Sequence, residues 1–115
     1  MTAASLFDHP GLLATAIAQA TDDVMFAKDL QGRYRMINSA GARLLGRTVD
    51  EVIGKDDGDL LPPEMARAVR EQDLRIMVSG EPETVEEAVT AGAARIHLST
   101  KAPYRDRLGN VIGMV

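Results

Sequence analysis

The sequence predicts a single α+β domain, in which helices and antiparallel strands occupy different stretches of the chain. Apolar residues recur every three or four positions at 10–20 and again after residues 62–64, the spacing of one helix face. Residues 95–103 instead alternate between apolar and polar side chains, as in a half-buried strand. At 115 residues without an internal repeat, the chain has about the length of one domain.

The first third of the chain is predicted to be a helix followed by a hairpin. Pro10 suits the first turn of a helix over residues 10–20, because its missing N–H needs no partner there. Two short apolar runs, at 24–27 and 34–37, flank a turn that contains Gly32. Runs of this kind around a glycine turn predict two antiparallel strands.

Two short helices are predicted next. Asn38 or Ser39 can cap the first by accepting from its free N–H groups, and Gly46 ends it. Thr48 and Glu51 have the spacing of a capping box, in which each side chain accepts from the backbone N–H of the other residue. A second short helix should therefore begin directly after Thr48.

The last part of the chain combines the longest helix with three strands. The helix is predicted over residues 62–80, with prolines at its start and Gly80 at its end. The strands are expected at 84–90, 95–103 and 111–115. In the middle strand the apolar phase is expected to face the core and the polar phase to face away from it. The apolar phase comprises Ile96, Leu98 and Thr100, and the polar phase Arg95, His97, Ser99 and Lys101.

Five segments in this order resemble the PAS sensor domain. They are residues 23–34, 37–46, 51–55, 59–64 and 101–113, and the likeness covers about residues 22–115. The resemblance implies the PAS fold: a five-stranded antiparallel sheet with the helices on one face, enclosing a small cavity. It also implies an N-terminal flanking helix over residues 1–21 and a sensor domain over 22–115, with the C-terminal effector absent from this chain.

The resemblance further implies a sensory and dimerisation module that is not an enzyme. Such domains typically precede histidine kinases or cyclic-dinucleotide enzymes, so we expect an output of that class. The flanking helix should cover the outer sheet face or pack against the same helix of a second protomer, as in a homodimer. Two alternatives stay open: a pure dimerisation module without a ligand, and, less favoured, an α+β enzyme with a buried carboxylate base.

A small ligand in the expected cavity would contact mostly apolar side chains. The same positions would serve a filled hydrophobic core equally well, so the sequence leaves both interpretations open. The candidate lining residues are Met25, Ile37, Asn38, Leu44, Leu45, Val52, Ile53, Met65, Val69, Leu98 and Thr100.

No catalytic or metal-binding set is predicted. The sequence has no Ser-His-Asp order and no phosphate-binding glycine loop at diagnostic spacing. The acidic cluster Asp56, Asp57 and Asp59 lacks the loop pattern of a calcium site, so a solvated turn and helix cap is expected there.

Composition argues against several cofactors and partners. Without cysteine there is no disulfide, no thiolate metal site and no cysteinyl link to a flavin or chromophore. PAS members that bind haem usually supply a histidine from the long helix, whereas this chain has only His9 and His97, so no cofactor is expected. A formal net charge of -4 disfavours nucleic acid, and no apolar run is long enough to cross a membrane. We therefore expect a cytoplasmic protein.

Overall fold

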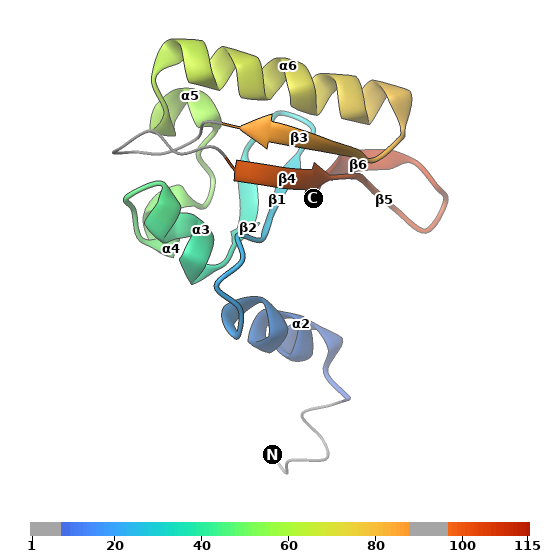
Figure 1. Ribbon diagram of the computed structural model, residues 1–115. Helices are drawn as coiled ribbons and strands as arrows, with labels where there is room; N and C mark the ends of the chain where they lie inside the picture. Colours follow the sequence, from blue (N-terminus) through green and yellow to red (C-terminus); the bar gives the residue numbers. More distant parts are fainter. Residues whose placement is uncertain (1–7, 88–96) are drawn as a thin grey trace.

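A computed structural model describes residues 8–87 and 97–115 of the chain. It shows an α+β domain, as predicted (Figure 1). The helices are α2 (Pro10–Gln19), α3 (Ser39–Leu44), α4 (Val49–Val52), α5 (Asp57–Leu60) and α6 (Pro63–Ser79). The strands are β1 (Phe26–Asp29), β2 (Tyr34–Ile37), β3 (Glu83–Glu87), β4 (His97–Lys101), β5 (Pro103–Arg105) and β6 (Val111–Met114).

The strands form an antiparallel sheet in the order β2-β1-β6-β5 and a two-stranded ribbon of β3 and β4. The predicted strand over 95–103 is corrected, because the segment forms β4 and β5 with a break at Ala102. Ala102 remains paired: its N–H donates to the Val115 carbonyl at 2.8 Å, and its carbonyl accepts from the Val115 N–H at 2.9 Å. Within residues 8–87 and 97–115, the five expected strands thus appear as six. The predicted strand over 84–90 is observed as β3, and residues 88–90 lie outside the described part.

Local capping determines where several helices begin and end. Asn38 rather than Ser39 caps α3, with its side chain accepting from the backbone of the first turn. The predicted capping box of α4 is confirmed: Glu51 N–H donates to Thr48 Oγ1 at 3.3 Å, and Thr48 N–H donates to Glu51 Oε1 at 3.0 Å. Helix α6 ends, as predicted, at Gly80, whose left-handed φ of 72° favours glycine.

The hydrophobic core lies between the four-stranded sheet and helices α3 to α6. Removing side chains of this size from water contributes about 1.5 to 3 kcal/mol each. No described residue of β3, β4, β5 or β6 belongs to the core cluster. Its members are Tyr34, Ile37, Leu45, Val52, Leu60, Leu61, Ala66 and Val69, with Phe26, Val49 and Met65 packed against them.

Helix α2 lies apart from the sheet, below it in Figure 1. Two hydrogen bonds near its C-terminal end attach it to the domain. Asn38 Nδ2 donates to the Ala18 carbonyl at 2.8 Å, and the Ser39 N–H donates to Gln19 Oε1 at 2.9 Å. Leu12 and Ile17 remain 52% and 58% exposed. In this single chain the described helix therefore does not cover the outer sheet face, which corrects the first of the two expected placements. Packing against the same helix of a second protomer stays a prediction.

Candidate functional site

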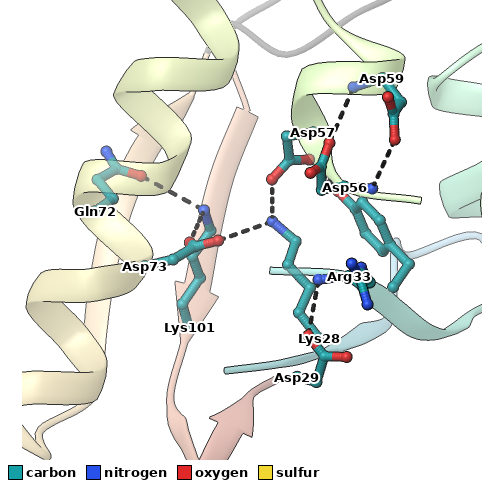
Figure 2. Close-up of polar contacts among 10 residues, drawn as sticks. Lys28, Asp29, Arg33, Asp56, Asp57, Asp59, Gln72, Asp73 and Lys101 are labelled. Atoms are coloured by element: carbon teal, nitrogen blue, oxygen red, sulfur yellow. Dashed lines mark hydrogen bonds and ion pairs between the residues drawn. The ribbon is translucent and has the colours of Figure 1, made fainter. Parts of the chain in front are cut away.

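Four charged side chains lie buried together between the strands and helices α5 and α6 (Figure 2). Lys28 comes from β1, Asp57 from α5, Asp73 from α6 and Lys101 from β4. Each of these side chains is at most 6% exposed. We call these four residues the ion cluster. It contains two positive and two negative side chains, so its formal charges balance.

Asp73 bridges the two lysines of the ion cluster (Figure 2). Lys28 Nζ donates to Asp57 Oδ2 at 2.6 Å and to Asp73 Oδ2 at 2.8 Å. Lys101 Nζ donates to Asp73 Oδ1 at 3.3 Å and to Gln72 Oε1 at 3.5 Å. One carboxylate on α6 therefore ties the four-stranded sheet, through Lys28, to the β3-β4 ribbon, through Lys101.

Two aromatic rings extend the cluster on the side of Lys28. The Tyr34 hydroxyl donates to Asp57 Oδ1 at 2.7 Å. Lys28 Nζ lies 4.8 Å from the centre of the Tyr34 ring and 5.2 Å from that of Phe26, within the range of cation–π attraction. The two rings meet edge to face with centroids 5.9 Å apart. Hydrogen bonds and ring contacts thus replace much of the hydration that Lys28 and Asp57 lose on burial.

A β-bulge brings Lys28 and Tyr34 to the same side of the sheet. Ala27 pairs with Met36, whereas Lys28 pairs with Tyr34, so Arg35 is the extra residue on β2. Directly paired residues of an antiparallel sheet lie on the same face. Lys28 and Tyr34 are both buried, while Met36 and Arg35 are exposed.

Helix α5 positions the carboxylate of Asp57. Asp56 and Asp59 form a second capping box, with the Asp59 N–H donating to Asp56 Oδ1 at 3.1 Å. Asp57, the first residue of the helix, points inward and is buried. The prediction of a helix cap is confirmed for Asp56 and Asp59. The prediction of a solvated cluster is wrong for Asp57, whose carboxylate has the Lys28 ammonium as partner.

The phase of β4 is the reverse of the prediction. Lys101 is 1% exposed, whereas Leu98 is 75% exposed. Thr100 is also exposed, and its hydroxyl is 3.0 Å from that of Thr84 on β3. Alternation defines two faces of a strand, but the choice of the buried face depends on the partner elements. Here Asp73 supplies the charge that makes burial of Lys101 tolerable.

The structure brings part of the predicted cavity lining together. Five of the predicted residues belong to the core or pack against it: Ile37, Leu45, Val52, Met65 and Val69. Leu44 is half-buried outside that cluster, and Asn38 is fully buried but serves the cap of α3 and the attachment of α2. The remaining predicted residues are exposed: Met25, Ile53, Leu98 and Thr100.

Sequence reasoning missed the charged residues of the interior, although it included the buried Asn38. The position of Asp73 in the sequence could have predicted its burial, because it follows Val69 by four residues and precedes Ile76 by three. This spacing puts a carboxylate on the apolar stripe of the long helix, and all three residues are buried. A charged residue on a buried stripe calls for a buried partner. No comparable signal marks Lys28, which lies next to an exposed turn in the sequence.

The chemistry of the ion cluster is that of paired charges. The buried carboxyl groups required by the enzyme alternative are present as Asp57 and Asp73, but each accepts a hydrogen bond from a lysine ammonium. Among the described residues no group of three or more His, Asp or Glu side chains could hold a metal ion. His9 is exposed, and the side chain of His97 lies outside the description. No helix in the described ranges is long and apolar enough to cross a membrane.

Comparison with known proteins connects the chain to a signalling relative. Over 100 residues it is 30% identical to the methanogenesis regulatory histidine kinase FilI of Methanothrix harundinacea. The match covers 85% of this chain but only 11% of the kinase. The chain thus spans about a tenth of the length of the curated relatives it matches.

Solved structures of the same fold support the family assignment. The PAS domain of BvgS from Bordetella pertussis superposes with a TM-score of 0.74 at 27% identity, covering 89% of this chain and 79% of that one. The protein VqmA of Vibrio cholerae, solved as a complex with ligand and DNA, superposes with a TM-score of 0.79 at 24% identity, covering 93% and 49%. The model of the PAS fold matches residues 18–115. The chain therefore belongs to the PAS fold family.

Proposed function

We propose that this PAS domain is the sensory module of a larger signalling protein and that a small ligand held beside the ion cluster is its signal. Membership of a sensory family and the likeness to the kinase FilI support an output of the histidine kinase or cyclic-dinucleotide enzyme class. The pairing of both buried carboxylates with lysines supports a regulatory rather than a catalytic role. The formal net charge of -4 supports a module that does not itself bind nucleic acid, and we place this module in the cytoplasm as part of the proposal.

The ion cluster is the observation that carries the proposal. Burial of a charged group costs several kcal/mol, and replacing a buried ion pair by apolar side chains is often neutral or stabilising. Four buried charges in a domain of this size are therefore weak contributors to net stability. In the proposed function, a small polar ligand would exchange hydrogen bonds with these lysine and aspartate side chains. No coloured cofactor is needed for such a site.

The proposed mechanism is a population shift between arrangements of the helices and the sheet. The ion cluster joins α5 and α6 to β1 and β4. A ligand that alters these contacts favours one arrangement over another. It can shift the equilibrium by no more than the difference between its affinities for the two arrangements.

Native mass spectrometry of the freshly purified chain, with an absorbance spectrum of the same sample, tests the ligand. We expect a non-covalent mass that is lost on denaturation, no visible absorbance, and loss of the bound mass in Lys101→Met. Arg75→Gln is the control, because Arg75 lies on α6 but pairs with Glu83 at the surface. A bare wild-type chain, or a bound mass that both variants retain, contradicts the proposal. A haem or flavin spectrum contradicts a colourless ligand.

Exposed apolar residues favour homodimerisation as a second function. Leu12 and Ile17 on α2 are more than half exposed, and Met36 on the outer sheet face is 40% exposed. We expect the double variant Leu12→Glu/Ile17→Glu to convert a dimer into a monomer in size-exclusion chromatography with light scattering. Leu108→Glu is the control, because Leu108 is 87% exposed near the β5-β6 turn. A wild-type monomer contradicts this function, whereas a dimer without bound mass favours the dimerisation-only alternative.

A further inference from the structure

The two lysines of the ion cluster lie at unequal distances from the carboxylate of Asp73. Lys28 Nζ lies 2.6 and 2.8 Å from carboxylate oxygens of Asp57 and Asp73. Lys101 Nζ lies 3.3 Å from Asp73 and 3.5 Å from the amide oxygen of Gln72. Strong hydrogen bonds between an ammonium and a carboxylate are about 2.7 to 2.9 Å long. The contact between Asp73 and Lys101 is therefore the looser part of the cluster.

The β3-β4 ribbon has little apolar anchoring of its own. Among its described side chains, only Val85 and Lys101 are buried. Leu98 points to solvent, and the hydrophobic core cluster includes no described residue of the ribbon. Segments with few buried apolar contacts open at a lower free-energy cost than the core of a domain. Two ionic contacts therefore attach the described part of the ribbon to α6: the buried contact of Lys101 with Asp73, and the exposed pair of Glu83 with Arg75.

Lys101 lies at the base of the ribbon, the place where the angle between the ribbon and the four-stranded sheet is set. It pairs with Glu83, the first residue of β3, and directly precedes Ala102, at which β4 and β5 separate. Ala102 is fixed to Val115 by two backbone hydrogen bonds. The ribbon is thus anchored at Ala102, and the next side chain along it is bound to α6.

We propose that the contact between Asp73 and Lys101 is the releasable contact of this domain and that its release allows the β3-β4 ribbon to move about Ala102. After release, Asp73 keeps the Lys28 ammonium as its partner, so no carboxylate is left alone in the interior. The flexible four-carbon side chain of Lys101 can carry its ammonium toward water or a ligand. Release of Lys28 would instead leave Asp57 and Asp73 without the cation that they share.

This inference rests on the proposed sensory function in one respect only, namely that a ligand causes the release. A ligand beside the cluster that offers a hydrogen-bond acceptor to Lys101 Nζ competes with Asp73 Oδ1 and thereby loosens the ribbon. Ligand binding would then move β3 and β4 more than β1 and β2. The release itself requires no ligand for its test.

Hydrogen–deuterium exchange of the 115-residue chain measures the release directly. In Lys101→Met we expect the described ribbon amides, at 83–87 and 97–101, to exchange at least tenfold faster than in the wild type. Amides of β1 and β2 should stay within twofold, because Lys28 and its two carboxylates are unchanged. Arg75→Gln is the matched control: it removes the exposed ion pair between α6 and Glu83, which has two 2.9 Å hydrogen bonds, and should leave all rates within twofold.

Three outcomes overturn the inference. They are unchanged exchange in Lys101→Met, equal acceleration of the ribbon and of β1, and failure of Lys101→Met to fold, because a releasable contact cannot be essential for the core. None of these outcomes decides the proposed sensory function, which is tested separately by native mass spectrometry of the wild-type chain. A bare wild-type chain combined with faster ribbon exchange would overturn ligand sensing and keep the releasable contact.

Discussion

The Nζ atom of Lys28 on β1 lies 2.6 Å from the Oδ2 atom of Asp57 on α5, and both side chains are buried. The two residues are 29 positions apart in the chain. A buried pair of this kind contributes little net stability compared with apolar side chains, but removal of one partner leaves an uncompensated charge. The contact is therefore tested by removing the cation alone.

We predict that Lys28→Met lowers the free energy of unfolding by about 3 to 5 kcal/mol, because it leaves two buried carboxylates without their shared ammonium. Urea denaturation followed by circular dichroism measures the loss. Lys55→Met, at an exposed position, is the control and should change stability by less than about 0.5 kcal/mol. A loss below about 1 kcal/mol in Lys28→Met would show that the cluster does not depend on this cation.

Tyr34→Phe tests the hydrogen bond at the other oxygen of Asp57. The substitution keeps the ring contacts with Lys28 and Phe26 and removes the hydroxyl that donates to Asp57 at 2.7 Å. We expect a loss of about 1 to 3 kcal/mol in thermal or urea unfolding, since a charged acceptor loses a buried donor. Tyr104→Phe removes a hydroxyl at a half-exposed site and should be nearly neutral. Equal effects of the two variants would contradict this account.

The helix ends could be predicted because their determinants are local. Thr48 and Glu51 satisfy each other's backbone within four residues, and Gly80 ends α6 through its own left-handed conformation. Side-chain alternation likewise located a strand in the region of β4. It could not show that Ala102 separates β4 from β5, since that break depends on which strands are available for pairing.

The ion cluster could not be predicted in the same way, because its pairs join segments far apart in the sequence. Lys28 meets Asp73 across 45 positions, and Lys101 meets the same carboxylate across 28. Lysine and aspartate are exposed in most proteins, so composition and periodicity favour the surface for each of them. Their burial depends on the tertiary contacts that bring all four charges together. Asp73, on the apolar stripe of α6, was the single local sign of such an arrangement.

Two glycines provide a test of close backbone packing beside the cluster. A Cβ at Gly113 on β6 would collide with the carbonyl oxygen of Lys28 on β1, whereas a Cβ at Gly11 on α2 would meet nothing within 4 Å. We expect Gly113→Ala to cost at least about 2 kcal/mol, because overpacking against backbone cannot be relieved by a rotamer change. Gly11→Ala should be neutral or stabilise by up to about 1 kcal/mol. Urea unfolding of both variants checks the contrast, and a well-tolerated Gly113→Ala would show that β1 and β6 are not held this closely.

Asp106 in the β5-β6 turn gives a pH-dependent prediction. The Asn110 backbone N–H donates to Oδ1 at 2.9 Å and holds the pKa of Asp106 below its ordinary value of 3.8, helped by the Asn110 side chain and the Leu108 N–H. A carboxyl group whose folded pKa is lowered binds protons more weakly when folded. Its stabilisation is therefore fully present above its unfolded pKa and is lost as the pH falls through the lower folded value.

An NMR titration of the Asp106 carboxyl between about pH 6 and pH 2, in the folded chain and in the urea-unfolded chain, measures this difference. We expect the folded midpoint to lie at the lower pH, and we expect Asp106→Asn to weaken the acid dependence of stability below the unfolded value. The folded pKa of Glu51, lowered by a hydrogen bond from the Thr48 backbone, should also lie below its unfolded value. The same holds for Glu83, whose pKa is lowered by a hydrogen bond from the Arg75 side chain. A folded midpoint for Asp106 at or above the unfolded one would mean that the turn does not stabilise the ionised carboxylate.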